Sequence, residues 1–364
     1  MNFSKDNRIV LTLDAGGTNF VFSAIQGYKQ IVEPIGLSAV SDNIEGCLDV
    51  LVNGFNQVIS KLNKKPVAIS FAFPGPADYE HGVIGDLQNF KAFRGGVALG
   101  PYLEEVFKIP VFINNDGNLF AYGEALAGML PEVNKAFEDA GSKRRYKNLI
   151  GITFGTGFGG GAVINGTLLT GDNGCGGDVW CMRNAKHTHM IAEEGVSVRA
   201  VRRVYQELSG KSAEGLTPYD IFKIAEGIEP GDQEAARGSF AELGTIAGNG
   251  IANAVNIVDG IVAIGGGLCG AGKYIMPALV DALNSHLTTF AGERVGMIQM
   301  KAYNWEDEEQ RNQFLGIDVD AVKVPRTDKT VPYLTNRATC VGFSKNGASS
   351  SIMYGAYAYA LANL

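Results

Sequence analysis

The stretch from Leu11 to Asn19, Leu-Thr-Leu-Asp-Ala-Gly-Gly-Thr-Asn, constrains the fold more than any other part of the sequence. An apolar run ends in Asp14, small residues follow, and a second apolar run begins at Phe20. This order predicts a strand, a tight glycine turn and a second strand. Backbone N–H groups at such a turn can approach phosphate oxygens, and Asp14 stands where it can hold a hydrated Mg²⁺. A plain glycine hairpin capped by Asp14 explains the same residues, so this stretch alone leaves both interpretations open.

The same pattern returns about 140 residues later. Asn148 to Phe154 predicts a strand, Gly155 to Gly161 a glycine turn, and Ala162 to Ile164 a second strand. A third glycine element, Gly265-Gly-Gly267, follows another apolar run. We therefore expect a duplicated fold in which each half contributes one phosphate-facing hairpin. Two unrelated glycine hairpins are the alternative.

Composition narrows the class of protein. A chain of 364 residues that is 46% hydrophobic predicts two domains. A net charge of −7 with no block of Lys or Arg argues against nucleic acid or an anionic membrane as the main partner. The short polar start and five scattered cysteines predict reduced thiols in a cytoplasmic protein.

Strand and helix patterns alternate through the first third of the chain. The spacing predicts a helix over 44–62, capped by Ser41 or Asp42, between runs that predict strands. Later patterns predict helices over 194–208, 217–226, 233–258, 274–286 and 349–361, whereas 306–330 gives no clear pattern. The fold class is therefore α/β with mixed sheets. We expect a smaller domain over 1–123, completed by a helix over 350–364, and a larger domain over 124–349.

Several short motifs, in order, carry a family resemblance. They are Asp14-Ala-Gly-Gly-Thr-Asn19, Phe73-Pro-Gly-Pro76, Leu87-Gln-Asn89, Asn114-Asn-Asp-Gly-Asn118, Phe154-Gly-Thr-Gly157, Glu193, Ile264-Gly-Gly-Gly267 and Tyr354-Gly-Ala356. Together they resemble the ROK family of sugar kinases, in the actin/hexokinase/Hsp70-like ATPase superfamily. The resemblance implies a two-domain actin-like (ribonuclease H-like) fold and a homodimer. It also implies ATP- and Mg²⁺-dependent phosphorylation of a hexose or N-acetylhexosamine at the 6-hydroxyl.

The resemblance also implies roles for individual residues. Asp116 matches the general base, although by sequence alone it is equally a helix N-cap. The residues that match sugar ligands are Asn89, Asn115, Gly155, Asp178 and Glu193; a turn role is the alternative for the two asparagines. Asp14 matches the ligand of Mg²⁺ through water. The residues expected to face ATP or its phosphates are Asp14, Gly16, Gly17, Thr18, Asn19, Thr156, Gly157, Gly265, Gly266 and Gly267.

One stretch departs from the family pattern. Family members carry a sugar-binding Glu, followed by a His and a cysteine run that bind structural zinc, whereas this chain has Asp178-Val-Trp-Cys-Met-Arg-Asn184 and no cysteine run. The usual zinc site is therefore expected to be absent, and loop residues without metal are favoured over a site made of Cys175, Cys181, His187 and His189. In the gap, Trp180 can stack on a sugar, and Arg183 and Asn184 can contact hydroxyl or phosphate groups.

Two other functions remain as rivals. A sugar-sensing repressor of the same family would need a DNA-binding helix-turn-helix before the first glycine hairpin, where this sequence has eight residues. A non-catalytic sugar-binding pseudokinase is suggested by the altered 178–184 stretch, and the retained Asp14, Asp116 and glycine elements argue against it.

Overall fold

The computed structural model describes residues 3–15, 19–40, 42–86, 91–317 and 319–364. The chain folds into two compact units. Unit 1 comprises 1–128, 161–177 and 345–364, and unit 2 comprises 129–160 and 178–344. The predicted boundaries were 123/124 and 349/350, with 161–177 in the larger domain. The hairpin around Gly161 joins unit 1 because its backbone packs on α3: a Cβ on Gly161 would lie 2.6 Å from the Gly117 carbonyl oxygen.

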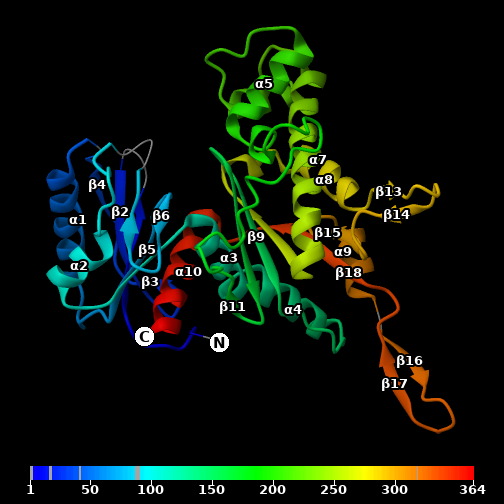
Figure 1. The fold of residues 1–364 in the computed structure, drawn as a ribbon, viewed down its shortest axis with the longest axis horizontal. Coiled ribbons are helices and arrows are strands. Elements are labelled where there is room, and N and C mark those ends of the chain that lie inside the picture. Colours follow the sequence, from blue (N-terminus) through cyan, green and yellow to red (C-terminus); the bar gives the residue numbers. More distant parts are fainter. Residues whose placement is uncertain (1–2, 16–18, 41, 87–90, 318) are drawn as a thin grey trace. The chain divides into compact units, whose positions relative to one another are not determined.

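Unit 1 is built on a mixed six-stranded sheet in the order β3-β2-β1-β5-β8, with β4 paired to β2 (Figure 1). The strands β1 and β2 form the predicted antiparallel hairpin, while β1, β5 and β8 run parallel. The bounds are β1 (Val10–Ala15), β2 (Asn19–Gln26), β3 (Lys29–Gln30), β4 (Ile35–Ser38), β5 (Ala68–Ala72), β6 (Ala77–Asp78), β7 (Val83–Ile84), β8 (Val111–Asn114), α1 (Ile44–Ile59), α2 (Leu99–Phe107), α3 (Asp116–Ala127) and α10 (Ala348–Asn363).

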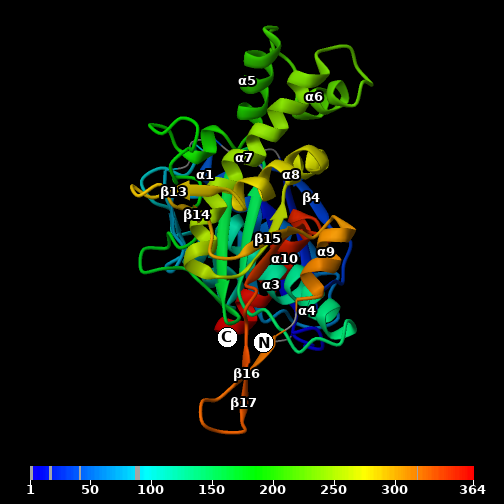
Figure 2. The same ribbon diagram turned by 90° about the vertical axis from the view of Figure 1, so that its right-hand side faces the viewer.

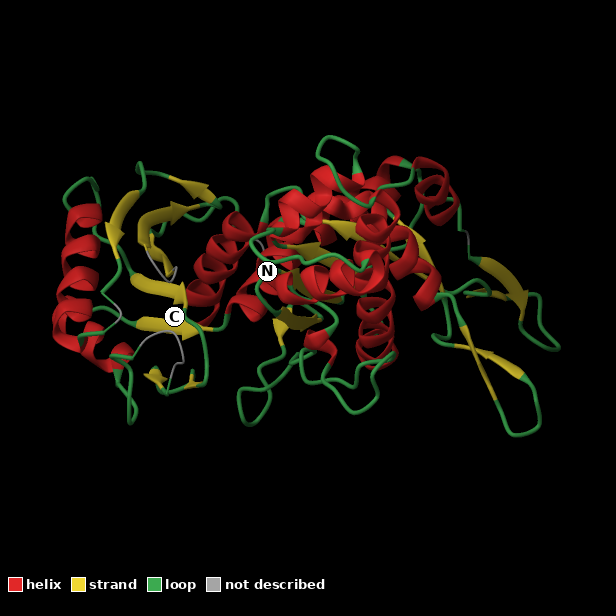
Figure 3. Cartoon of the chain, turned by 90° about the horizontal axis from the view of Figure 1, so that it is seen from above, coloured by secondary structure: helices red, strands yellow, loops and turns green. Residues whose placement is uncertain are grey.

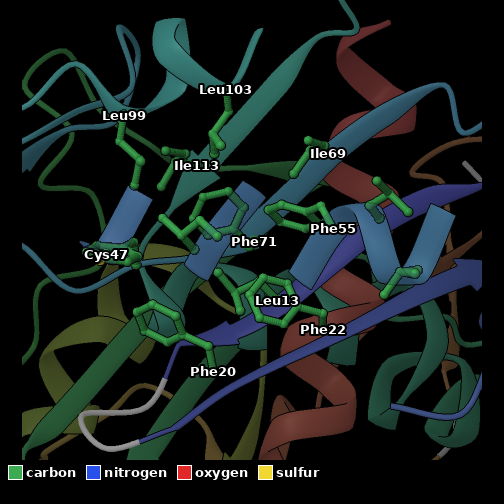
Figure 4. Packing of buried hydrophobic residues seen from close by; sticks show 14 of the residues in the cluster. Leu13, Phe20, Phe22, Cys47, Phe55, Ile69, Phe71, Leu99, Leu103 and Ile113 are labelled. Carbon is green, nitrogen blue, oxygen red and sulfur yellow. The ribbon is translucent and has the colours of Figure 1, made fainter. Parts of the chain in front are cut away.

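The two faces of the first sheet are covered by different helices. Alternate residues of β1 point to opposite faces, so Leu11 and Leu13 join the cluster under α1 and α2 whereas Val10 packs against α10. Figure 4 shows the first cluster, in which Phe22 and Phe71 of the sheet surround Phe55 of α1. The N-cap of α1 is Asn43, whose Oδ1 accepts from the Gly46 N–H at 3.3 Å. The helix begins at Ile44 as predicted, but the prediction of Ser41 or Asp42 as its cap was wrong, because the N-cap is Asn43, directly before the first helical residue. Ser41 itself lies outside the described residues.

The second six-stranded sheet has the order β11-β10-β9-β12-β18-β15. It repeats the first: an antiparallel meander, then parallel strands added beside its first member. This shared order supports the predicted duplication. The strands and helices of this half are α4 (Met129–Asp139), β9 (Leu149–Phe154), β10 (Phe158–Ile164), β11 (Thr167–Leu168), η1 (Ala192–Glu194), α5 (Val198–Ser209), α6 (Pro218–Ala225), α7 (Gln233–Val258), β12 (Ile261–Gly265), η2 (Gly267–Ala271), α8 (Gly272–Leu283), β15 (Lys301–Asn304), α9 (Glu308–Leu315) and β18 (Ala338–Phe343).

Two further hairpins belong to unit 2 and lie outside its sheet. The first is made of β13 (His286–Thr288) and β14 (Arg294–Gly296), and the second of β16 (Asp320–Lys323) and β17 (Thr330–Tyr333). Both extend away from the helices and sheet of this unit (Figures 1 and 2). Figure 3 shows them as separate pairs of strands. None of the described helices has the length and apolar character needed to cross a membrane.

Candidate functional site

Three parallel strands bring the first set of predicted residues to one edge of the first sheet. Asp14 is in register with Ala72 of β5, and Ala72 is in register with Asn114 of β8. The carboxyl ends of the three strands therefore meet at this edge. Asp14 occupies the end of β1, and Asp116 follows β8 by two residues.

Asp14 is exposed at the edge, and no hydrogen bond or ion pair joins its carboxylate to another described side chain. Carboxylate oxygens are hard ligands of the kind that Mg²⁺ prefers, and they accept hydrogen bonds from the water molecules that Mg²⁺ keeps. Asp14 therefore fits the predicted metal. Asn19 is also exposed, at the start of β2. The predicted phosphate residues Gly16, Gly17 and Thr18, and the predicted sugar ligand Asn89, lie outside the described residues.

The start of α3 separates two roles that the sequence left together. Asn115 is the N-cap, and its Oδ1 accepts from the Asn118 N–H at 2.6 Å. Asp116 is the first helical residue, and its Oδ1 accepts from the adjacent Gly117 N–H at 2.9 Å. The buried Asn114 supports this turn, because its Oδ1 accepts from Asn115 N–H at 2.8 Å and from Asn118 Nδ2 at 3.0 Å. Asp116 is therefore not needed as a cap.

The environment of Asp116 alters its acidity. Although the residue is reached by solvent, the protein around its carboxyl group limits hydration, and this raises the pKa of Asp116. The Gly117 N–H acts in the opposite direction, and the negative charge of Asp14 adds to the rise. A carboxylate with a raised pKa is a better proton acceptor than an ordinary aspartate.

A second set of predicted residues gathers in unit 2 around the turn between β9 and β10. The Gly155 N–H donates to the Gly157 carbonyl oxygen at 3.1 Å, and the Gly155 oxygen accepts from Val198 N–H at 3.0 Å. Glu193 lies against this turn, because its Oε2 accepts from the Phe158 N–H at 3.1 Å. A Cβ on Gly157 would lie 2.3 Å from that Oε2, so any larger residue at this position would displace the Glu193 carboxylate. Thr156 is exposed at the tip.

Arg199 holds Glu193 from the other side. Its Nη2 lies 2.9 Å from Glu193 Oε1 and 2.7 Å from Glu194 Oε1. One guanidinium thus bridges two neighbouring carboxylates, as its planar fork of donors allows. Sequence reasoning missed this residue. The available signal was an arginine five and six residues after a Glu-Glu pair, at the start of a helix.

Residues 178–184, which depart from the family pattern, lie beside Glu193. The Trp180 carbonyl oxygen accepts from the Glu193 N–H at 3.2 Å. Loss of hydration raises the pKa of Asp178, and a hydrogen bond with the Trp180 side chain acts against that rise. Trp180 is 41% exposed. Asn184, by contrast, is buried, and its Oδ1 accepts from the Lys186 and His187 N–H groups at 2.9 Å. Asn184 therefore shapes the loop, and its predicted contact with a ligand is not supported.

The thiols and imidazoles of this region do not form a metal cluster. Cys175 and Cys181 are exposed free thiols that donate to the backbone oxygens of Asn173 and Asp178. Among the residues that the structure describes, no group of three or more His, Cys, Asp or Glu side chains is placed to hold a metal ion.

The third glycine element completes the cluster in unit 2. Gly265 of β12 is in register with Thr153 of β9, which places Gly265, Gly266 and Gly267 beside the Gly155 turn. Gly266 has φ 103°, and a Cβ there would lie 2.2 Å from the Phe154 carbonyl oxygen, so only glycine fits. A hollow of about 120 Å³ lies next to it, with Tyr219, Phe222 and Phe240 among the residues that line it.

Comparisons with known proteins identify the family. The family model described as "ROK family" matches residues 10–308, which is most of the chain. The chain belongs to the ROK family. A glucokinase of Halalkalibacterium halodurans is 27% identical over 79% of this chain and 88% of its own length. An N-acetyl-D-glucosamine kinase of Mannheimia succiniciproducens is 24% identical over 80% and 93%. A crystal structure of a glucokinase from Parabacteroides distasonis is 55% identical, covers 100% of both chains and superposes with a TM-score of 0.91.

The family prediction and the α/β actin-like ATPase fold are thus confirmed. Within unit 1 the structure brings Asp14, Asn115 and Asp116 to one sheet edge. Within unit 2 it brings together Gly155, Thr156, Gly157, Asp178, Glu193 and the Gly265–Gly267 turn.

Proposed function

We propose that this ROK-family chain transfers the terminal phosphoryl group of ATP to the 6-hydroxyl of a hexose or N-acetylhexosamine, with Asp116 as the general base. The observation that carries the proposal is the start of α3. Asn115 caps the helix, which leaves a carboxylate of raised pKa beside Asp14 at the carboxyl edge of parallel strands.

That the chain is an ATP-dependent sugar kinase follows from its relatives, which include sugar kinases aligned over most of its length and a 55% identical glucokinase. The finer statements about the hydroxyl group and the base are the proposal.

Phosphoryl transfer needs positioning, neutralised charge and an acceptor for the hydroxyl proton. Asp116 would accept the proton of the sugar hydroxyl as the new O–P bond forms. Asp14 would hold Mg²⁺ through water, and the bound ion would supply neutralising charge on the phosphate oxygens.

Sugar binding is assigned first to Asn115 and Glu193. Asn115 keeps its amide Nδ2 available, since only its Oδ1 serves the helix cap. Each oxygen of Glu193 accepts one protein hydrogen bond and retains a lone pair for a sugar hydroxyl. Asn89, Gly155 and Asp178 complete the proposed sugar ligands.

Nucleotide binding is assigned to the glycine turns. Backbone N–H groups of such turns bind phosphate oxygens. The apolar hollow beside Gly267 suits the base of the nucleotide. The proposed residues are Asp14, Gly16, Gly17, Thr18, Asn19, Thr156, Gly157, Gly265, Gly266 and Gly267.

Release of ADP over a panel of hexoses and amino sugars tests the reaction, and phosphorus NMR of the product identifies the hydroxyl. Asp116→Asn should lower kcat by about 10²- to 10⁴-fold while ATP still binds. Asp49→Asn removes the same charge from an exposed position on α1, in the same unit, and should leave kcat unchanged. Near-normal turnover by Asp116→Asn would disprove the role of Asp116 as the general base. Sugar binding without ADP release by the wild type would instead favour the pseudokinase.

A further inference from the structure

Three arginines of α5 line a hollow that the proposed reaction does not use. Arg202 and Arg203 follow Arg199 by three and four residues, so the three side chains lie on one face of the helix. The hollow has a volume of about 510 Å³, and its other polar lining residues are Gln206, Ser212 and Glu214. We call it the arginine hollow. It lies within unit 2, where Figure 1 shows α5 at the opposite end from β17.

Two of the three arginines are already held by carboxylates. Arg203 Nη1 donates to both carboxylate oxygens of Glu207, at 2.8 and 2.9 Å. Nε and Nη2 of Arg199 donate to Glu193 and Glu194. These pairs set the direction of both guanidinium groups before any ligand arrives, which lowers the entropy that a ligand must spend on ordering them.

Arg202 has no such partner. Among the described residues, no carboxylate forms an ion pair with it, and its Nη2 donates only to the Ala213 carbonyl oxygen. That bond is 3.4 Å long, beyond the range of about 2.7–3.2 Å that is usual for N–H donors. The Arg202 Nε is buried and has no hydrogen-bond partner. A cation that loses hydration without gaining a partner is costly, so the side chain calls for an anion that the described chain does not supply.

The lining favours a phosphate group that is attached to a small polyol. Guanidinium groups bind phosphate oxygens through paired N–H donors. The volume lies within the range of about 300–1,000 Å³ that is typical of pockets for small organic molecules, so there is room for more than a bare phosphate. The Glu214 carboxylate accepts hydrogen bonds from hydroxyl groups, and Ser212 Oγ, which accepts from the Glu214 N–H at 3.2 Å, keeps its own O–H to donate. One phosphate with hydroxyl groups beside it matches both the cations and the carboxylate.

Arg199 connects the arginine hollow with Glu193. Its Nη2 lies 2.9 Å from Glu193 Oε1, whereas no described group accepts from its Nη1. A phosphate that binds Nη1 shares the charge of this guanidinium and repels the Glu193 carboxylate. An anion in the hollow should therefore loosen the hold of Arg199 on Glu193.

We propose that the arginine hollow binds the phosphate group of a polyol phosphate, and that its occupancy weakens sugar binding through Arg199. The binding site stands on Arg202 and the lining of the hollow alone. The effect on sugar rests on the proposed function, in which Glu193 is a sugar ligand. Phosphorylation of the sugar would then slow when polyol phosphates accumulate.

Calorimetric titration of the full chain, at an ionic strength held constant with sodium chloride, tests the binding site. Glycerol 3-phosphate should bind more tightly than inorganic phosphate, and glycerol should not bind. Arg202→Gln should weaken binding of both phosphates at least about tenfold. Arg294→Gln, the matched control, removes the same charge from an exposed position on β14 and should bind as the wild type does. Phosphate that binds elsewhere on the chain is common to all three proteins, so the difference between them reports the hollow.

Glu214→Gln keeps the test informative if Arg202→Gln folds poorly, because it should increase binding. It removes the carboxylate that lines the hollow, and should tighten binding of inorganic phosphate up to about fivefold. The proposed site is overturned if glycerol 3-phosphate does not bind, if Arg202→Gln binds it as the wild type does, or if Glu214→Gln binds inorganic phosphate more weakly. Tighter binding of inorganic phosphate than of glycerol 3-phosphate would overturn the ligand class.

The KM for sugar tests the effect on the sugar site. With the best substrate of the sugar panel, saturating glycerol 3-phosphate should raise the KM of the wild type and of Arg294→Gln about fivefold, the lower end of the range for coupled sites. The KM of Arg202→Gln should respond far less. An unchanged wild-type KM, with binding intact, would overturn the coupling. Because calorimetry needs no turnover, a chain that binds glycerol 3-phosphate but releases no ADP with any sugar would refute the proposed function and leave the binding site standing.

Discussion

At the residue scale, the candidate site depends on which of Asn115 and Asp116 caps α3 and which is left to act as a base. Sequence alone could not tell an N-cap from a base, because Asn and Asp are both preferred caps. The geometry assigns the cap to Asn115. It leaves Asp116 with one backbone hydrogen bond in a poorly hydrated place. This position suits Asp116 to accept a proton, and it adds little to the stability of the fold.

Asp116→Asn should therefore stabilise the fold at neutral and alkaline pH. The pKa of Asp116 is raised in the folded state, so the folded chain binds this proton more tightly than the unfolded chain does, and the ionised group lowers stability above the raised pKa. The advantage of the variant should shrink as pH falls through the raised pKa and past 3.8, the unshifted value, because the folded chain and then the unfolded chain bind the proton. Thermal unfolding midpoints at pH 8 and pH 4 measure this. A variant less stable than the wild type at pH 8 would contradict the expectation.

Arg199 should act through Glu193. Losing the guanidinium frees the carboxylate that the Phe158 N–H also holds. Arg199→Gln should raise the KM for sugar roughly tenfold, about 1.4 kcal/mol, with a smaller change in kcat. Arg203→Gln makes the same charge change on α5, where the arginine pairs with Glu207 instead, and should leave KM unchanged. Equal KM values for the two variants would remove Arg199 from the site.

At the scale of elements, the packing of α10 on α3 depends on two glycines. A Cβ on Gly355 would lie 1.8 Å from the Leu119 carbonyl oxygen, and one on Gly123 would lie 1.9 Å from the Ser351 oxygen. Both neighbours are helix backbone, which cannot move aside as a flexible side chain can. The helices therefore approach backbone to backbone, and this contact positions the start of α3.

Gly355→Ala should lower the free energy of unfolding by about 3 kcal/mol, the upper end of the range for overpacking. Gly36→Ala in β4 places its Cβ where no atom lies within 4 Å, and should change stability little. Urea denaturation of both variants gives the comparison. If Gly355→Ala lowered the free energy of unfolding by less than Gly36→Ala does, α10 would not pack on α3 as described.

The elements that sequence predicted well are those with strong local signals. The 26-residue α7 (Gln233–Val258) matches its predicted range of 233–258, because its cap and its apolar period agree. The strands at Gly155 and Asp14 were predicted from apolar runs ending in glycine. The central strand β18 (Ala338–Phe343) was missed, since its short run contains Cys and Gly and takes its identity from neighbours distant in sequence. The two hairpins were missed because exposed strands lack the burial that creates a pattern.

At the scale of the whole molecule, the chain returns to unit 1 at its end. Tyr357, Ala360 and Leu361 of α10 form a buried cluster with Val10 and Ile25 of the first sheet. Removing 345–364 should expose that face. Burial of each large apolar side chain is worth about 1.5–3 kcal/mol, so the loss is comparable with the entire stability of a domain.

The shortened chain should lose ADP release, and trypsin should digest unit 1 faster than unit 2. Removing only residues 362–364, which are exposed, is the matched control and should behave like the wild type. If unit 1 of the chain ending at 344 resisted trypsin as well as unit 2 does, the first sheet would be stable without α10.

The same return of the chain has a consequence for its synthesis. The strands β1, β5 and β8 are complete when residue 114 is made, but the helix that covers their second face begins at Ala348. At 5–20 residues per second, roughly 10 to 50 s of translation separate the two. During that interval the face around Val10 and Ile25 has no native cover. The nascent protein is therefore a natural client for chaperones until α10 is made.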